Sequence, residues 1–202
     1  KDIKEFFHIL RSGRCPEHLK ADTFSLIDAL LPLQTLLGWI QNSLPNDIQA
    51  ELDQPLDTMA AHSPNTKLRM IHYPPLTGKE APSAVRAAAH EDINLITLLP
   101  AATAKGLQAK TASGEWVDVY CPDQALIINA GDMLAECTQG FIRSTTHRVI
   151  NPVGEDAYTS RMSMPLFVHP KDEVRLSQRH TAKSYREERY RGNGFKISQP
   201  NP

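Results

Sequence analysis

The sequence predicts a mainly β fold with helices packed outside it, and two observations predict this class. From residue 67 to residue 168, short apolar segments alternate with turn signals such as Ser113-Gly114 and Gly131-Asp132. Many short strands at such spacing are typical of a β-sandwich or barrel, and the double-sheet jelly roll is one such arrangement. Before residue 67, apolar residues instead recur at helical spacing.

Length and composition describe one ordinary globular domain. The 202 residues carry a formal net charge of −1, with 41% hydrophobic and 22% charged residues. We expect a single domain over 1–202, with 1–66 a mainly helical scaffold, 67–170 the jelly-roll core and 171–202 a C-terminal tail with a helix. The net charge argues against a nucleic-acid partner, and no apolar run approaches the ~20 residues of a membrane span. The sequence does not indicate an oligomeric state.

Cysteine usage predicts a cytoplasmic protein. Cys15, Cys121 and Cys137 form an odd set without C-x-x-C spacing, which argues against a disulfide framework or a zinc-cysteine site. We expect all three to pack as small apolar residues. The chain opens abruptly at Lys1 without an initiator Met, so we also expect a natural N-terminal segment to be missing from this sequence.

The N-terminal third predicts helices. Asp2–Leu10 suggests a short amphipathic turn capped by Asp2, and Ser12–Lys20 is predicted to be a loop because it contains Gly13 and Pro16. Asp22–Ile40 has apolar residues at spacings of three and four, which predicts a helix that starts at Asp22 or Thr23 and is broken or kinked at Pro32.

Further helices are predicted at 46–52 and at 184–191. The second is strongly charged and reads as a solvated surface helix, because Glu187 and Glu188 balance its arginines. The segments 11–21, 53–66 and 76–83 are predicted to carry substrate specificity, since loops and flanking helices do so in many folds.

The strands are predicted from short apolar runs bounded by turn residues. A β-strand places residues i and i+2 on one face, so each run also predicts which side chains lie together. The predicted strands are 67–73, 84–90, 94–99, 106–110, 115–120, 125–129, 133–137, 146–151 and 160–168.

Two histidines and one aspartate form a candidate metal site. His90 and Asp92 can share one face at a strand end, and His147 would have to come from a distant strand. Two imidazoles and a carboxylate form the facial triad of non-haem Fe(II) oxygenases, although zinc could also occupy such a set. His90-Glu91 also starts like the zinc protease motif H-E-x-x-H, but Asn94 stands where the second histidine is required, so that interpretation fails.

A candidate anion site follows the second histidine. Arg161 lies 14 residues after His147, and Ser163 should share its strand face. A guanidinium binds a carboxylate bidentately and the hydroxyl adds a donor, which suits the far carboxylate of a small keto-diacid chelating the metal. Tyr73 is a further candidate donor. Alternatively, Arg161 could pair with a structural carboxylate and Tyr73 could be a core residue.

The chain resembles the 2-oxoglutarate and Fe(II)-dependent oxygenases of the isopenicillin N synthase-like group, particularly its bacterial members. The resemblance covers most of the chain and is densest from Leu68 to Pro170. Its motifs are Lys4–Phe7, Leu68–Pro75, Gly106–Gln108, Trp116-Val117, Ala125–Asp132, Ser144–Val149 and Arg161–Ser163.

The resemblance implies a double-stranded β-helix (jelly roll) and an oxygenase activity. The enzyme would oxidise, by hydroxylation, an unidentified small molecule with O2 and 2-oxoglutarate, releasing succinate and CO2; desaturation or cyclisation are variants. The implied iron ligands are His90, Asp92 and His147; the 2-oxoglutarate residues are Arg161, Ser163 and Tyr73; Phe167 would lie against the site near substrate.

The sequence departs from the family pattern at two positions, and two alternative functions remain open. Glu91 replaces a frequent Thr, and Ile71 replaces a frequent Asn that could affect how 2-oxoglutarate or substrate is seated. A branch of the family with the same fold oxidises its substrate without 2-oxoglutarate. The other rival is a non-catalytic jelly-roll binding module with a vestigial metal site.

Overall fold

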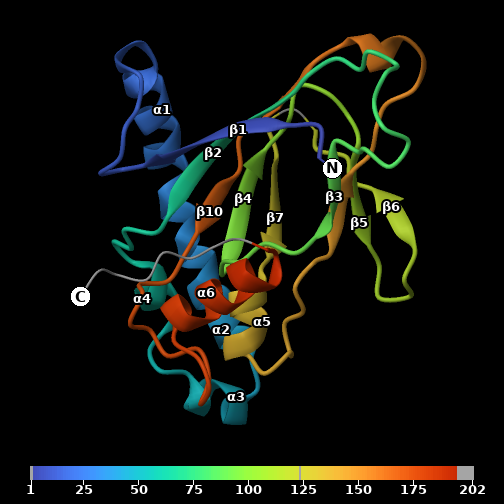
Figure 1. The fold of residues 1–202 in the computed structure, drawn as a ribbon. Coiled ribbons are helices and arrows are strands. Elements are labelled where there is room, and N and C mark those ends of the chain that lie inside the picture. Colours follow the sequence, from blue (N-terminus) through green and yellow to red (C-terminus); the bar gives the residue numbers. More distant parts are fainter. Residues whose placement is uncertain (1, 123, 195–202) are drawn as a thin grey trace.

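The computed structural model describes residues 2–122 and 124–194, which form two antiparallel sheets with helices outside (Figure 1). The larger sheet has the order β1 (Glu5–Leu10), β2 (Lys67–Tyr73), β10 (Leu166–Val168), β4 (Ile96–Pro100), β7 (Leu126–Ala130), and β9 (Arg161–Ser163) also pairs with β2. The smaller sheet has the order β3 (Ala87–His90), β8 (His147–Val149), β5 (Leu107–Lys110), β6 (Trp116–Asp118). The fold is therefore the mainly β jelly roll that the sequence predicts.

The helices lie outside the two sheets. They are α1 (Glu17–Leu30), the 3-10 helix η1 (Leu31–Thr35), α2 (Leu36–Ser43), α3 (Asn46–Glu51), α4 (Leu56–Ala60), α5 (Asp132–Cys137), the 3-10 helix η2 (Gly154–Tyr158) and α6 (Ala182–Gly192). Helix α3 confirms the prediction at 46–52. Helix α4 lies inside 53–66, one of the segments predicted to carry specificity.

The larger sheet separates the main apolar core from the interior between the sheets. Leu68, Leu166 and Val168 are fully buried in the core on its helical side. Burial of each such side chain stabilises the fold by roughly 1.5–3 kcal/mol. Because successive strand residues alternate in direction, Arg69 and Phe167 face the opposite side, towards the smaller sheet.

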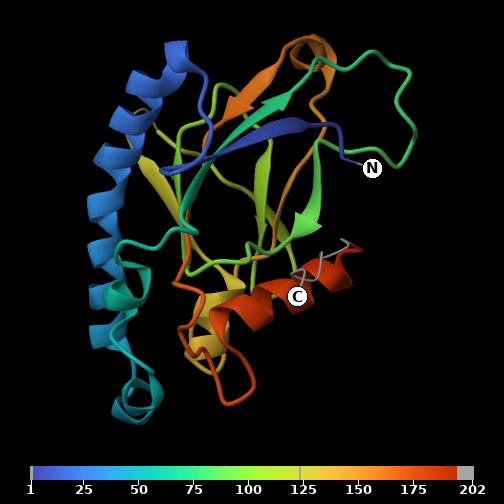
Figure 2. The ribbon, with the colours of Figure 1, turned by 60° about the vertical axis from the view of Figure 1, so that its left-hand side comes forward.

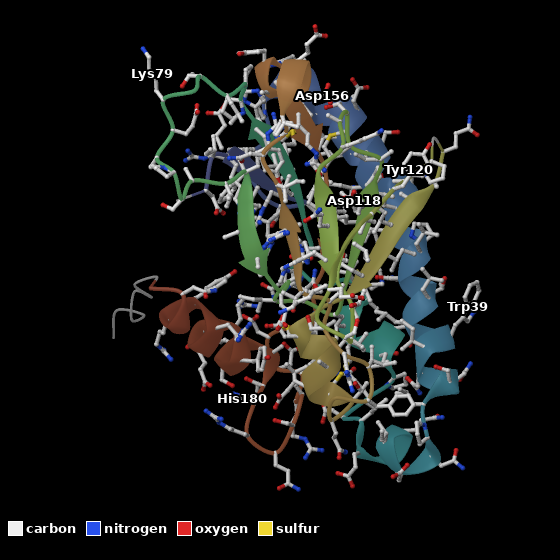
Figure 3. All side chains as sticks on the ribbon, turned by 90° about the vertical axis from the view of Figure 1, so that its right-hand side faces the viewer. Trp39, Lys79, Asp118, Tyr120, Asp156 and His180 are labelled. Carbon is white, nitrogen blue, oxygen red and sulfur yellow. The ribbon has the colours of Figure 1, made fainter. Side chains whose placement is uncertain are left out.

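Helices α1 and α2 cover the outer face of the larger sheet (Figure 2). Ile27 and Leu37 are buried against the sheet, whereas Trp39 points away from the molecule (Figure 3). Pro32 lies at the start of η1, which confirms the predicted interruption. The predicted start at Asp22 or Thr23 is wrong, because α1 begins at Glu17 directly after Pro16.

The helical run Glu17–Ser43 is apolar enough, by length and composition, to cross a membrane. It has 27 residues and a mean hydropathy of 1.3, so the expectation that no such run exists is wrong for these residues. A core helix of a soluble protein passes the same test. Four residues of this run, Thr23, Ile27, Leu30 and Leu37, are buried, and 22% of its apolar window is buried.

Two predictions made from local pattern are wrong. Asp2–Leu10 is not a helical turn, because Glu5–Leu10 pairs with β2 along six residues and a long-range ladder outweighs the local preference. Residues 133–137 are not a strand but lie in α5. Met133 and Cys137 are both buried, and this spacing of four is helical.

The predicted strand 160–168 is two strands. β9 ends at Ser163 and β10 begins at Leu166, with Pro165 between them. Proline lacks the backbone donor that a continuous ladder needs. As a result Arg161 and Ser163 pair with the C-terminal half of β2, while Leu166 pairs with its N-terminal half.

Helix α6 confirms the prediction at 184–191, and Thr181 caps it through a capping box with Ser184. It is more than a solvated helix, since Arg186 contacts Asp172 at 2.7 Å and Arg189 contacts the buried Asp132 at 2.8 Å. The predicted tail beyond residue 194 lies outside the described residues.

Two histidines near β2 are held in the neutral form. Burial, followed by the charges of Arg69 and Lys67, lowers the pKa of His8 to about 4. His169 is 3% exposed, and its burial, with the charges of Lys67 and Arg186 behind it, lowers its pKa well below the ordinary value.

We predict that the metal-free protein loses stability as the pH falls from 7.5 to 5. The unfolded chain protonates these histidines below about pH 6.5, whereas folding keeps His8 neutral until about pH 4. His8 is only partly buried, so we expect about 1 kcal/mol from it between these pH values. Urea unfolding at both pH values measures the change, and His8→Gln should flatten it. An equal free energy of unfolding at both would contradict the prediction.

Candidate metal and anion site

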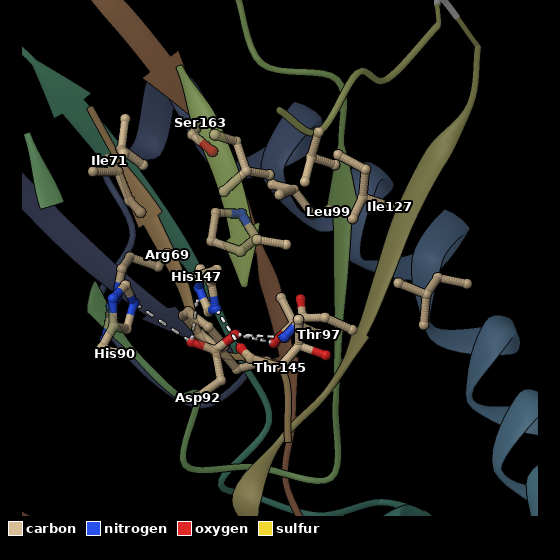
Figure 4. Close-up of a pocket in the computed structure, with 18 of the residues that line it drawn as sticks. Arg69, Ile71, His90, Asp92, Thr97, Leu99, Ile127, Thr145, His147 and Ser163 are labelled. Atoms are coloured by element: carbon tan, nitrogen blue, oxygen red, sulfur yellow. Dashed lines mark hydrogen bonds and ion pairs between the residues drawn. The ribbon is translucent and has the colours of Figure 1, made fainter. Parts of the chain in front are cut away.

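A cavity of about 260 Å³ lies between the two sheets (Figure 4). Strands β2, β4, β7, β9 and β10 of the larger sheet line it together with β3, β5 and β8 of the smaller sheet. None of its lining residues comes from 11–21, 53–66 or 76–83, so the lining does not confirm the predicted specificity segments. All seven site residues predicted from sequence do line it: Tyr73, His90, Asp92, His147, Arg161, Ser163 and Phe167.

The three predicted metal ligands converge at one end of this cavity. One ligand atom from each of His90, Asp92 and His147 lies within 4.8 Å of the other two. The Nε2 atoms of both histidines are 3.9 Å from Asp92 Oδ1. His90 and His147 are directly paired across β3 and β8, which brings together residues 57 positions apart in the sequence. The arrangement can hold a metal ion with part of its coordination sphere open.

The imidazoles of His90 and His147 both direct Nε2 towards Asp92 Oδ1. His90 Nδ1 lies 2.7 Å from the carbonyl oxygen of Ala88, and His147 Nδ1 lies 2.9 Å from that of Thr145. A carbonyl oxygen can only accept, so each Nδ1 carries the proton and each Nε2 has a free lone pair. Burial and the neighbouring His147 also lower the pKa of His90, which favours the neutral form that metals bind.

Asp92 is held so that one carboxylate oxygen remains free for a metal. Thr97 Oγ1 donates to Asp92 Oδ2 at 2.6 Å, and Asn129 Nδ2 donates to the same oxygen at 3.1 Å. Asn94 in turn donates to Thr97 Oγ1 at 2.8 Å. Oδ1 is thereby left facing the two histidines. The sequence pattern indicated no role for Thr97, Asn94 or Asn129. The contact of Asn129 with Asp92 depends on the pairing of β4 with β7, which sets Asn129 opposite Thr97.

The backbone around Asp92 requires a glycine at residue 131. A Cβ there would collide with the side chain and backbone of Asn94 and come within 2.7 Å of the Asp92 carbonyl oxygen. This close approach lets the amides of Asp132 and Met133 donate to the carbonyl oxygens of Asp92 and Asn94. The start of α5 thus fixes the loop that carries the carboxylate ligand.

The open side of the metal cluster is at His90. Its side chain is 38% exposed, against 16% for His147 and 7% for Asp92. Nitrogen and carboxylate donors in this combination suit Fe(II), and zinc shares the same preference.

Arg161 lies buried in the same cavity and lacks a full set of partners. Its side chain is almost inaccessible, and its Nε donates to the carbonyl oxygen of Ala104 at 2.9 Å. Its Nη1 is buried without a hydrogen-bond partner among the described residues. A buried unpaired donor on a cation is costly, and an incoming carboxylate would relieve that cost. The predicted alternative, pairing with a structural carboxylate, is absent among the ion pairs of the described residues.

Tyr73 and Ser163 line the cavity together with Arg161 and belong to the same candidate anion site. Tyr73 pairs with Arg161 across β2 and β9, and the guanidinium carbon lies 5.1 Å from its ring centre. Burial raises the pKa of Tyr73, so the phenol remains a hydrogen-bond donor. Ser163 is buried opposite Ile71 in the same ladder. Ile71 therefore places an apolar side chain beside these donors.

Glu91 links the two ligand-bearing segments from outside the cavity. Thr146 Oγ1 donates to Glu91 Oε1 at 2.9 Å, and Arg189 of α6 lies 3.8 Å from the other oxygen. Glu91 stands between His90 and Asp92 in the sequence, and Thr146 directly precedes His147. Glu91, which departs from the family pattern, therefore connects the segments that carry the candidate metal ligands to each other and to the C-terminal helix.

Comparison with known sequences points to one family. Residues 64–170, just over half of the chain, match the 2OG-Fe(II) oxygenase superfamily. The chain is 34% identical over 106 residues to the 2-oxoglutarate-dependent dioxygenase citB of Monascus ruber, covering 51% of this chain and 32% of that protein. It is 38% identical over 112 residues to 2-oxoglutarate-dependent dioxygenase 11 of Oryza sativa subsp. japonica, covering 54% and 29%. The matched segment thus spans about a third of the curated relatives.

Solved structures show the same fold. A protein of Shewanella oneidensis described as an oxygenase superposes with a TM-score of 0.87 at 49% identity, covering 97% of this chain and 73% of that chain. A Caulobacter crescentus protein described as a 2OG-Fe(II) oxygenase family member gives a TM-score of 0.69 at 28% identity, with coverage of 95% and 70%. A Neurospora crassa protein, solved in complex with alpha-KG, gives 0.74 at 24% identity, covering 96% and 66%, which supports the fold alone.

We predict that Thr146→Val weakens Fe(II) binding about tenfold, because it removes the hydrogen bond that joins the two ligand segments. Anaerobic competition with a chromophoric chelator measures the affinity. Glu91→Gln is the matched variant: it keeps an acceptor for Thr146 and removes only the distant charge contact with Arg189, so near-normal affinity is expected. Normal affinity in Thr146→Val would contradict this role.

Proposed function

Because this chain belongs to the 2OG-Fe(II) oxygenase superfamily, we propose that it is a non-haem Fe(II)- and 2-oxoglutarate-dependent dioxygenase. It oxidises, by hydroxylation, a small molecule with O2, releasing succinate and CO2. One observation carries the proposal: the cluster of His90, Asp92 and His147 and the guanidinium of Arg161, whose Nη1 has no hydrogen-bond partner among the described residues, line one cavity. A metal at one end and an anion site at the other suit a keto-diacid that binds both.

His90, Asp92 and His147 would hold the iron. The donor set fits, since both Nε2 lone pairs and Asp92 Oδ1 point to one place. When bound, Fe(II) and 2-oxoglutarate supply the redox chemistry that activates O2. The protein contributes a fixed, partly open ligand set, because Thr97 and Asn129 occupy the second oxygen of Asp92.

Arg161, Ser163 and Tyr73 would bind the far carboxylate of 2-oxoglutarate. Arg161 supplies the charge and a free donor nitrogen, and the two hydroxyls add neutral donors. Apolar side chains that include Leu99 and Phe167 line the remaining wall and limit water near the metal. Phe167 lies against the site, where the substrate would also contact it.

We also propose the isopenicillin N synthase-like group and a cytoplasmic location. The ordered motifs from Leu68 to Ser163 support the group, and the likeness to the Shewanella protein supports a bacterial member. All three cysteines are free, which suits a reducing compartment. A small molecule is the proposed partner, with neither nucleic acid nor membrane involved.

Anaerobic absorption spectroscopy tests the proposal. A weak visible band that appears only when Fe(II) and 2-oxoglutarate are both present would report chelation at the metal. Iron binding without the band would favour the branch that does not use 2-oxoglutarate. Failure to bind iron would favour a non-catalytic binding module.

We predict that His147→Ala abolishes the band and the release of succinate, because it removes one of the three ligands held around the metal position. Circular dichroism checks that the variant is folded. Turnover at the wild-type rate would overturn the metal assignment.

We predict that Arg161→Ala raises the 2-oxoglutarate concentration needed for the band by about a hundredfold, since a buried charged pair is lost. Titration of 2-oxoglutarate at saturating Fe(II) measures the shift. An unchanged titration would assign Arg161 to the substrate or to structure.

A further inference from the structure

A second arginine enters the cavity from β2. Arg69, Ile71 and Tyr73 lie two residues apart on this strand and all line the cavity. Arg69 thus shares a strand face with the tyrosine of the anion site, four residues away along the chain. Its position is labelled in Figure 4 together with the metal ligands.

The Arg69 guanidinium is held by neutral groups. Its Nε lies 2.7 Å from His8 Nε2, and its carbon lies 4.7 Å from the ring centres of both Phe6 and Phe167. An arginine always donates, so His8 accepts, which agrees with the lowered pKa that keeps it neutral. Two aromatic rings and a neutral imidazole orient the group without cancelling its charge.

No carboxylate compensates Arg69 within the described part of the chain. The ion pairs there leave Arg69 without a carboxylate within 4.0 Å, whereas Arg186 and Arg189 each have one. The carboxylate in the cavity that interacts electrostatically with Arg69 is that of Asp92, which belongs to the candidate metal cluster. A half-buried cation with this surrounding favours an anionic ligand.

The charges of the proposed complex also favour one more anion. Fe(II), Asp92, Arg161 and the dianion of 2-oxoglutarate together sum to zero. Lys4, which also lines the cavity, is paired with Asp2 at 2.7 Å. Arg69 remains as the single uncompensated positive charge among the described lining residues. One further negative charge would balance the cavity.

We propose that Arg69 is a substrate-binding residue that holds the carboxylate of a small organic acid, and that this enzyme oxidises monocarboxylates with an apolar body. The inference rests on the proposed function, because it assigns 2-oxoglutarate to Arg161. Leu99, Leu107 and Ile127 line the cavity and provide the apolar surface for the remainder of the substrate. The guanidinium fixes one end of the acid and thereby determines which carbon faces the metal.

A carboxylate suits this site better than a phosphate. A phosphate monoester carries between one and two negative charges at neutral pH, and the neutral His8 adds none of the extra positive charge it would need. The cavity of about 260 Å³ must also accept 2-oxoglutarate, which restricts the acid to a small one.

The test uses the anaerobic protein saturated with Fe(II) and 2-oxoglutarate, so that the Arg161 site is filled. Short aliphatic and aryl carboxylic acids and their primary amides are titrated as matched pairs, and calorimetry measures each affinity. At least one acid should bind about tenfold or more tightly than its amide, since the amide keeps the shape and loses the charge. Arg69→Gln should abolish this preference, and Arg69→Lys should keep part of it.

Arg148→Gln is the matched control. Arg148 also lies over an aromatic ring, 4.1 Å from that of Trp116, but it does not line the cavity, so the preference for acids should persist. If every amide binds as tightly as its acid, or if Arg69→Gln keeps the preference, the proposal is overturned. The visible band of the Fe(II) and 2-oxoglutarate complex distinguishes failure of the proposed function from failure of the role of Arg69. A missing band overturns the proposed function. A normal band without a preference for acids overturns only the role of Arg69.

Discussion

The register of β2 is the constraint on which the site depends. This strand is paired with β1 on one side and with β9 and β10 on the other. Its period of two places Leu68 in the helical core and sends Arg69, Ile71 and Tyr73 into the cavity. A slip of one residue would exchange these two sets, burying a guanidinium in the apolar core, so the core itself holds the binding residues in position.

A second ladder does the same for the metal ligands. The pairing of β3 with β8 sets His90 opposite His147, and the start of α5 packs onto the loop that carries Asp92. The close approach at Gly131 makes this packing possible. The strand pairing and the backbone hydrogen bonds of α5 restrict where the candidate ligands can lie, which a metal site with open positions requires.

The candidate site residues could be predicted from the sequence more readily than the long-range contacts around them. The His90 and Asp92 pair and most strands could be predicted, because ligand type and period two are local properties. The strand at Glu5–Leu10, the helix at 132–137 and the contact of Asn129 with Asp92 could not, because each depends on a partner distant in the sequence. Such partners are decided by tertiary packing, which local pattern does not encode.

Several buried polar atoms lack hydrogen-bond partners, and their position relative to the cavity indicates which of them concern function. Arg86 and His169 also have buried nitrogens without partners, so an unsatisfied atom alone does not identify a site. Arg161, with its unpartnered Nη1, differs because it lines a cavity that also contains Asp92. Arg69 lines the same cavity and has no carboxylate partner within 4.0 Å among the described residues. Uncompensated cations cost stability in the ligand-free protein, and ligands that relieve this cost must stabilise the fold when they bind. The ligand-free protein is therefore expected to have a lower free energy of unfolding than the ligand-bound protein, because the uncompensated cations lie in the cavity.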